Sequence, residues 1–224
     1  CRIPRNNQCH VIGDMDAPLL NLTISDLLAQ TVSDMPDQPA AVFPQQGIRW
    51  SYREFSQQVD RLASGLLALG IIKGDRVGIW SPNRVEWLLT QFATARIGAI
   101  LVCINPAYRL TELEYALNNV GCVALVTARA FKGSDYTGML ATLAPEIAAS
   151  VGGPLQLERL PDLRHIIVMG DDVPRGMHAF DAVCADGGPC DRATLDQISA
   201  RLSPQDPINI QFTSGTTGSP KGAC

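Results

Sequence analysis

Several patterns that mark common classes of protein are missing from this sequence. Its eighteen basic and twenty-two acidic residues give a net charge of -4, and no block of like charge occurs. Such dispersed charge argues against a nucleic-acid partner. The longest apolar runs, at 62–72 and 97–104, are well short of the roughly 18 residues that a membrane span requires. We therefore expect no nucleic-acid partner and no transmembrane segment.

Disulfide and metal-ligand patterns are missing as well. The seven cysteines include no C-x-x-C pair, and Cys103 and Cys122 lie inside apolar, strand-like runs. This pattern is typical of reduced, buried thiols, so we expect an intracellular, cytoplasmic location. The histidines, His10, His165 and His178, have no zinc-ligand spacing. No structural metal is expected.

An alternation of strand-like and helical segments begins near residue 71. The chain has 224 residues, of which 46% are apolar, enough for a sizeable core. Strands followed by amphipathic helices favour parallel strands with right-handed crossovers. The predicted strands lie at residues 76–80, 99–104, 122–127, 165–169 and 206–213. We expect an α/β fold with a doubly wound, mostly parallel sheet over residues 40–224, preceded by an N-terminal extension over residues 1–39.

The region before this alternation is predicted to contain a hairpin and a helix. Residues 40–43 and 48–52 are strand-like and flank a turn at 44–47, so we expect a β-hairpin at the margin of the sheet. Ser51 and Glu54 have the spacing of a capping box and predict a helix start. The apolar face of that helix is formed by Phe55, Val59, Leu62, Leu66 and Leu69.

Further helices are predicted after the strands. The expected capping pairs are Asn83 with Glu86 and Thr111 with Glu114. Gly98 and Gly121 mark the ends of these two helices. Residues 138–150 are also predicted to be helical. Residues 170–192 are rich in Gly, Pro and Asp and are predicted to form a loop.

A segment rich in glycine and hydroxyl residues follows the last predicted strand. Its residues are Thr213, Ser214, Gly215, Thr216, Thr217, Gly218, Ser219, Pro220, Lys221 and Gly222. Glycine lets backbone N–H groups turn toward a ligand, hydroxyl groups donate further hydrogen bonds, and Lys221 supplies a positive charge. Ordinary surface turns have similar residues, but open α/β sheets bind ligands just after such strands. We interpret the segment as a phosphate-binding loop.

This segment resembles the signature of a known superfamily. Gly215 and Lys221 have the spacing of a Walker A loop, but Pro220 and Gly222 replace its second glycine and its Ser/Thr. The ten residues instead resemble, position for position, the loop of the adenylate-forming (AMP-binding) superfamily. Stretches at 77–81, 83–87 and 97–106 resemble the first α/β subdomain of the N-terminal domain in the fatty acyl-CoA synthetase branch.

The resemblance implies an ATP-dependent acid–CoA ligase. Such an enzyme activates a carboxylic acid, expected here to be a fatty acid, to an acyl-adenylate and then to a coenzyme A thioester. In the loop, Thr213, Ser214, Thr216 and Thr217 with the glycine amides would bind the β- and γ-phosphates of ATP. Lys221 would neutralise the departing pyrophosphate. Mg²⁺ is implied too, but no residue that matches its protein ligand occurs in this chain.

The resemblance also implies that this chain is an N-terminal fragment. Nothing in it matches the family's adenine-stacking segment, its ribose-binding aspartate, its hinge or its adenylation lysine. We expect the chain alone to be inactive, and we expect no element after the loop to hold it, because the sequence stops at Cys224. Two alternatives stay open: an adenylation domain with another acid or acceptor, and a non-catalytic nucleotide-binding relic.

Overall fold

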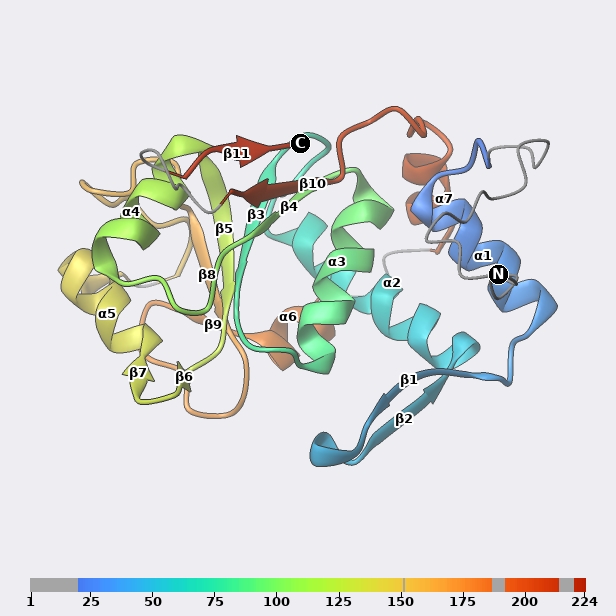
Figure 1. Ribbon diagram of the computed structural model, residues 1–224, viewed down its shortest axis with the longest axis horizontal. Coiled ribbons are helices and arrows are strands. Elements are labelled where there is room, and N and C mark those ends of the chain that lie inside the picture. Colours follow the sequence, from blue (N-terminus) through green and yellow to red (C-terminus); the bar gives the residue numbers. More distant parts are fainter. Residues whose placement is uncertain (1–19, 151, 187–191, 214–219) are drawn as a thin grey trace, which may run out of the picture.

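The computed structural model describes residues 20–150, 152–186, 192–213 and 220–224 (Figure 1). Within these residues a seven-stranded sheet has the order β11-β10-β4-β3-β5-β8-β9. Its strands are β3 Arg76–Trp80, β4 Ile100–Cys103, β5 Cys122–Thr127, β8 His165–Val168, β9 His178–Ala179, β10 Asn209–Phe212 and β11 Gly222–Ala223. Neighbouring strands pair in parallel except β10 and β11, which are antiparallel. The predicted mostly parallel sheet is confirmed.

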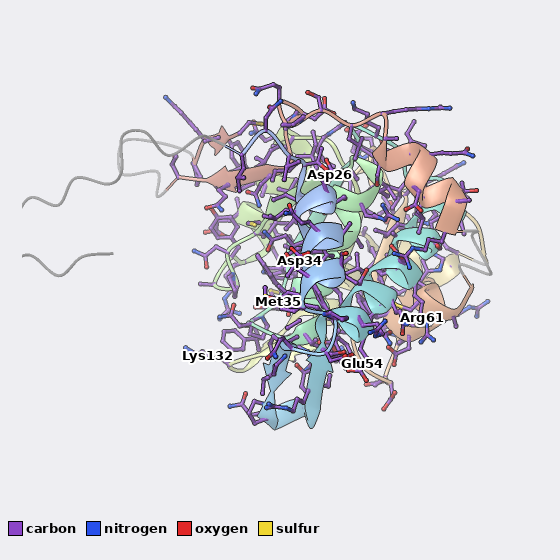
Figure 2. All side chains as sticks on the ribbon, turned by 90° about the vertical axis from the view of Figure 1, so that its right-hand side faces the viewer. Asp26, Asp34, Met35, Glu54, Arg61 and Lys132 are labelled. Atoms are coloured by element: carbon purple, nitrogen blue, oxygen red, sulfur yellow. The ribbon has the colours of Figure 1, made fainter. Side chains whose placement is uncertain are left out.

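Helices cover both faces of this sheet, as a doubly wound fold requires. One face carries α2 Tyr52–Ala68, α3 Val85–Ile97 and α6 Phe180–Asp186, and the other carries α4 Leu110–Asn119 and α5 Tyr136–Leu143 (Figure 1). An outer layer of α1 Ile24–Asp34 and α7 Arg192–Ser199 contacts α2 and α3. Figure 2 looks onto this layer, with Asp26 and Asp34 near the two ends of α1. In the described part of the chain, no helix combines the length and the apolar character needed to cross a membrane.

Two small sheets lie apart from the main one. The predicted hairpin is present as β1 Pro39–Phe43 and β2 Ile48–Ser51, joined by a 3-10 turn at Pro44–Gln46. It pairs with itself alone, so its predicted place at the margin of the main sheet is wrong. β6 Ala130–Phe131 and β7 Ser134–Asp135 form the other small sheet.

The start of α2 is as predicted. The Ser51 N–H donates to Glu54 Oε2 at 2.8 Å, and the Glu54 N–H donates to Ser51 Oγ at 3.3 Å. The apolar face of α2 packs into the core between α2 and the sheet, because four of its five members are buried and Leu69 packs against them.

The predicted cap of α3 is wrong. Its N-cap residue is Arg84, whose side chain makes no capping hydrogen bond. The Val85 N–H instead donates to Oε1 of Gln46 at 3.0 Å, and Gln46 Nε2 donates to Glu86 Oε2 at 3.0 Å. Gln46, in the turn of the β1–β2 hairpin, thus accepts the hydrogen bond at the start of α3, a role that the local pattern had assigned to Asn83.

The predicted cap of α4 is also wrong. The helix begins two residues earlier, with Arg109 rather than Thr111 as the N-cap. The Arg109 N–H donates to Glu112 Oε2 at 3.1 Å. Glu114 is therefore inside the helix, where it forms an ion pair with Arg159. The local pattern thus placed the capping pair two positions too far along the chain.

The remaining helices differ from the predictions in extent. The helix predicted at 138–150 ends at Leu143, and Pro145–Ala149 forms a 3-10 turn, because proline has no N–H to continue an α-helix. The loop predicted at 170–192 contains β9 and α6. Neither α1 nor α7 was expected, and α1 lies inside the predicted N-terminal extension. The boundary after residue 39 stays a prediction.

Candidate functional site

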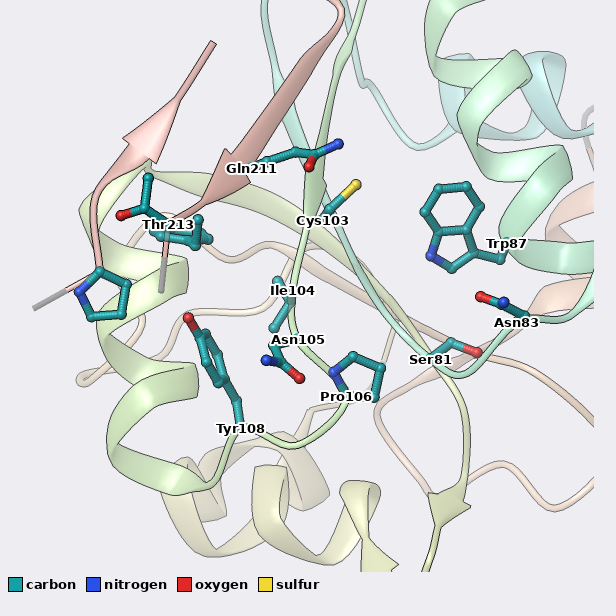
Figure 3. Close-up of a pocket in the computed structure, with 12 residues that line it drawn as sticks. Ser81, Asn83, Trp87, Cys103, Ile104, Asn105, Pro106, Tyr108, Gln211 and Thr213 are labelled. Atoms are coloured by element: carbon teal, nitrogen blue, oxygen red, sulfur yellow. The ribbon is translucent and has the colours of Figure 1, made fainter. Parts of the chain in front are cut away.

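A cavity of about 580 Å³ opens at the carboxyl ends of β3, β4 and β10 (Figure 3). The chain leaves β3 toward α3 on one face of the sheet and leaves β4 toward α4 on the other. Neighbouring strands whose connections go to opposite faces create a crevice between them. Open α/β sheets bind their ligands in such a crevice.

The side of the cavity next to α3 carries polar and aromatic groups. Ser81, Asn83 and Trp87 line it, and in Figure 3 Trp87 and Asn83 stand across the cavity from Tyr108 and Thr213. Asn83 is available there because it does not cap α3. The sequence singled out none of these side chains as a site residue, although their position just after β3 was a usable signal.

The opposite side of the cavity is formed by the loop after β4, and hydrogen bonds within the loop and from Tyr136 fix its conformation. Asn105 Oδ1 accepts the N–H of Ala107 at 2.9 Å, which closes a tight turn. The hydroxyl of Tyr136 donates to the carbonyl oxygen of Pro106 at 2.6 Å. The Tyr136 ring stacks on Trp80, with ring centroids 3.7 Å apart. These contacts give the cavity a preformed wall.

Cys103 lies between these two sides at the end of β4. Its thiol is half-buried, and Asn209 Nδ2 lies 3.4 Å from Sγ. Burial raises the pKa of the Cys103 thiol, and the hydrogen bond from Asn209 only partly opposes this effect. The group is therefore a neutral thiol near pH 7 and contributes to the cavity by its shape and not as a nucleophile.

The two ends of the glycine-rich segment lie side by side, next to a pair of antiparallel strands at the mouth of the cavity. β10 and β11 pair in register Gln211 with Ala223 and Phe212 with Gly222. Beyond this pairing, the Thr213 N–H donates to the Lys221 carbonyl oxygen at 3.0 Å, and the Lys221 N–H donates to Thr213 Oγ1 at 3.2 Å. The expectation that no element would hold the segment is wrong, because β11 returns along β10.

Four of the ten predicted phosphate-binding residues are placed by the structure. Thr213 and Pro220 line the cavity, Lys221 is exposed, and Gly222 lies in β11. The other six, Ser214, Gly215, Thr216, Thr217, Gly218 and Ser219, lie outside the described residues. The two ends of the segment therefore meet beside the cavity.

The groups at this mouth fit an anionic ligand. None of the ion pairs among the described residues involves Lys221, so its ammonium group is available to phosphate. Thr213 Oγ1 accepts from the Lys221 N–H, which leaves its own proton for donation. Among the residues described, no three His, Cys, Asp or Glu side chains gather as metal ligands.

Comparison with known proteins gives one family and several named relatives. The AMP-binding enzyme family matches residues 28–224. The medium-chain acyl-CoA ligase ACSF2, mitochondrial, of Danio rerio is 45% identical over 221 residues, covering 99% of this chain and 36% of that protein. The human protein of that name is 43% identical over 223 residues, covering 98% of this chain and 36% of its own length. The putative acyl-CoA synthetase YngI of Bacillus subtilis is 39% identical over 206 residues, covering 92% of this chain and 38% of its own length.

Solved structures show the same fold. An anthranilate CoA ligase, AuaEII, in complex with anthranoyl-AMP matches with a TM-score of 0.70 at 23% identity, covering 92% of this chain and 35% of that chain. A putative long-chain-fatty-acid CoA ligase from Rhodopseudomonas palustris matches with a TM-score of 0.70 at 25% identity, covering 91% and 44%. This chain thus spans about a third of the length of its curated relatives, 36% to 38%.

Proposed function

Because the chain belongs to the AMP-binding enzyme family, we propose that its protein is an ATP-dependent acid–CoA ligase that acts on a medium-chain fatty acid. The observation that carries this proposal is the pair of hydrogen bonds between Thr213 and Lys221, which brings the two ends of the glycine-rich segment together at the mouth of the cavity. The names of the ACSF2 relatives, 43% and 45% identical, support the medium-chain acid, and those names together with that of YngI support coenzyme A as the acceptor.

The chemistry requires activation of the acid. A carboxylate is a poor acyl donor, because its charge repels nucleophiles and oxide is a poor leaving group. In the proposed reaction a carboxylate oxygen bonds to the α-phosphorus of ATP, and the bond from that phosphorus to pyrophosphate breaks. The thiolate sulfur of coenzyme A then bonds to the acyl carbon of the adenylate, and AMP leaves with the electron pair.

The residues of this chain would act on the leaving pyrophosphate. Negative charge accumulates on its oxygens as the bond breaks, so donors placed there lower the barrier. We assign the Lys221 ammonium group and the Thr213 hydroxyl to the β- and γ-phosphates, together with the hydroxyl groups and amides of residues 214–219. Mg²⁺ would add positive charge on the same phosphates when bound. Its protein ligand is expected outside this chain.

Acid-dependent exchange of labelled pyrophosphate into ATP tests the activation step in the full-length protein. We expect exchange only when a fatty acid is present, and formation of AMP and an acyl-CoA when coenzyme A is added. Lys221→Met removes the charge and should slow exchange at least about tenfold. Lys132→Met, at the exposed tip of the β6–β7 hairpin, is the matched control and should leave exchange unchanged.

Other outcomes of this experiment identify the alternatives. Exchange with acid but no thioester in the presence of coenzyme A would indicate another acceptor. No exchange with any fatty, aryl or amino acid, in protein that is folded, would contradict the proposal and favour a non-catalytic relic. The cytoplasmic location inferred from the cysteines stays a prediction, and the animal relatives are named as mitochondrial proteins.

A further inference from the structure

A hydrogen bond connects α4 to the C-terminal end of the glycine-rich segment. The hydroxyl of Tyr115 donates to the carbonyl oxygen of Pro220 at 3.0 Å, across 105 positions of sequence. Val120, the residue that caps the end of α4, lies close to β11, because a Cβ added to Gly222 would lie 3.3 Å from Val120 Cγ1. α4 and its C-cap residue thus pack against residues 220–222.

The hydrogen bond from Tyr115 is the second of two that restrain the peptide unit between Pro220 and Lys221. The Pro220 carbonyl oxygen and the Lys221 N–H belong to the same planar group. The first accepts from Tyr115, and the second donates to Thr213 Oγ1 at 3.2 Å. The pyrrolidine ring already restricts φ of Pro220, and these two bonds, made at opposite edges of the peptide plane, restrain its ψ. The Thr213 N–H, which donates to the Lys221 carbonyl oxygen at 3.0 Å, restrains the next peptide unit. Together these bonds restrain the direction in which the Lys221 side chain leaves the backbone.

We infer that Tyr115 is a positioning residue for Lys221, and this inference rests on the proposed role of Lys221 at the phosphates of ATP. A charged group stabilises the transition state most when it is already in position before the reaction, because reorienting it during the reaction costs free energy. Tyr115 does not itself line the cavity. It acts through the carbonyl group of Pro220, and 36% of its own surface is exposed.

Tyr115→Phe in the full-length protein tests the inference with two readouts. The first is amide hydrogen exchange of the nucleotide-free protein, in which the Lys221 N–H should exchange at least about threefold faster because its peptide plane is held on one side only. The second is steady-state kinetics. We expect KM for MgATP to rise about three- to tenfold, because this is the factor that corresponds to the net free energy of one ordinary hydrogen bond. KM for the acid should stay unchanged.

The matched control is Tyr52→Phe, which removes a hydroxyl from the first turn of α2 and should change neither readout. Unchanged exchange at Lys221 in Tyr115→Phe would overturn the inference whatever the protein catalyses. Faster exchange with an unchanged KM for MgATP in an active enzyme would overturn the functional part of it. Equal increases in both KM values would indicate a general structural defect and would also contradict it.

The two proposals fail in different ways. A wild-type protein that activates no acid contradicts the proposed ligase function. In that case titration with MgATP replaces the kinetics, and Tyr115→Phe is expected to weaken binding by the same three- to tenfold factor. Binding that is equal in both proteins would overturn the positioning role independently of catalysis.

Discussion

His165 shows how a position in the sheet changes the chemistry of one side chain. It starts β8, is 4% exposed, and its Nδ1 lies 3.3 Å from Nε2 of His178 in β9. Burial, with the nearby charges of His178 and Arg164, lowers the pKa of His165 to about 4. The ring is therefore neutral in the folded protein at pH values where the unfolded chain already holds its proton.

We predict a stability loss at mildly acidic pH from this residue. Between pH 6.5 and about 4 the unfolded state binds more protons at His165 than the folded state, so the free energy of unfolding falls as the pH drops through this window. The loss amounts to about 3 kcal/mol at about 1.4 kcal/mol per pKa unit. Urea denaturation at a series of pH values measures it.

The comparison for this prediction is His165→Gln, which keeps a hydrogen-bonding group next to His178. Its stability should be flatter than the wild type between pH 6.5 and 4, while both proteins lose stability in parallel at lower pH, where carboxylates are protonated. Parallel curves through the upper window would show that His165 is not the group responsible.

At the scale of elements, contacts between helices and the hairpin decide where α3 begins. Gln46 is predicted to act as its cap, because its side-chain oxygen accepts the Val85 N–H. Gln46→Ala should lower the free energy of unfolding by about 0.5–2 kcal/mol, the usual cost of losing a cap. Asn83→Ala is the control and should cost little, since its side chain lines the cavity instead. If thermal denaturation showed a larger loss of stability for Asn83→Ala than for Gln46→Ala, Asn83 would be the cap of α3 and this prediction would be wrong.

A second element-scale prediction concerns the contact of α2 with α6. A Cβ added to Gly65 would overlap the carbonyl oxygen of Val183 in α6. Alanine is the better helix former by about 1 kcal/mol, so a purely local effect would make Gly65→Ala stabilising. We expect it to destabilise by about 1–3 kcal/mol, because the helices must separate.

Ala68→Gly provides the matched control on the exposed last turn of α2, and helix propensity alone should make it cost about 1 kcal/mol. Urea denaturation of both variants measures the two effects. Stabilisation by Gly65→Ala would mean that α2 and α6 pack less closely in solution.

At the scale of the molecule, the cavity is built from the ends of three strands far apart in sequence. We predict that the 224-residue chain alone binds MgATP more weakly than roughly 100 μM, which corresponds to about 5.5 kcal/mol. Hydrogen bonds and one ammonium charge must offset the desolvation of a polyanion and its lost freedom, without any predicted adenine pocket. Calorimetric titration measures this affinity. A micromolar constant would show that the described elements already form most of the site.

Local sequence patterns determined strands β3, β4, β5, β8 and β10, the α2 cap and the phosphate-binding interpretation of residues 213–222. Each of these signals depends on residues that are neighbours along the chain, such as Ser51 with Glu54 or the apolar run of β5. Interactions between residues close in sequence are strong enough to be predicted without knowing the tertiary structure. The same is true of the loop, because its residues are consecutive.

Only the tertiary structure decided the features that depend on distant partners. Gln46 caps α3 and Tyr115 reaches Pro220, and neither pair leaves a periodic or spaced signal in the sequence. β9 and α6 lie within a stretch rich in loop residues, and burial of Phe180 and Val183 outweighs that local composition. The cavity exists because the order of strands places β10 beside β4, and strand order depends on packing across the whole sheet, which no local preference specifies.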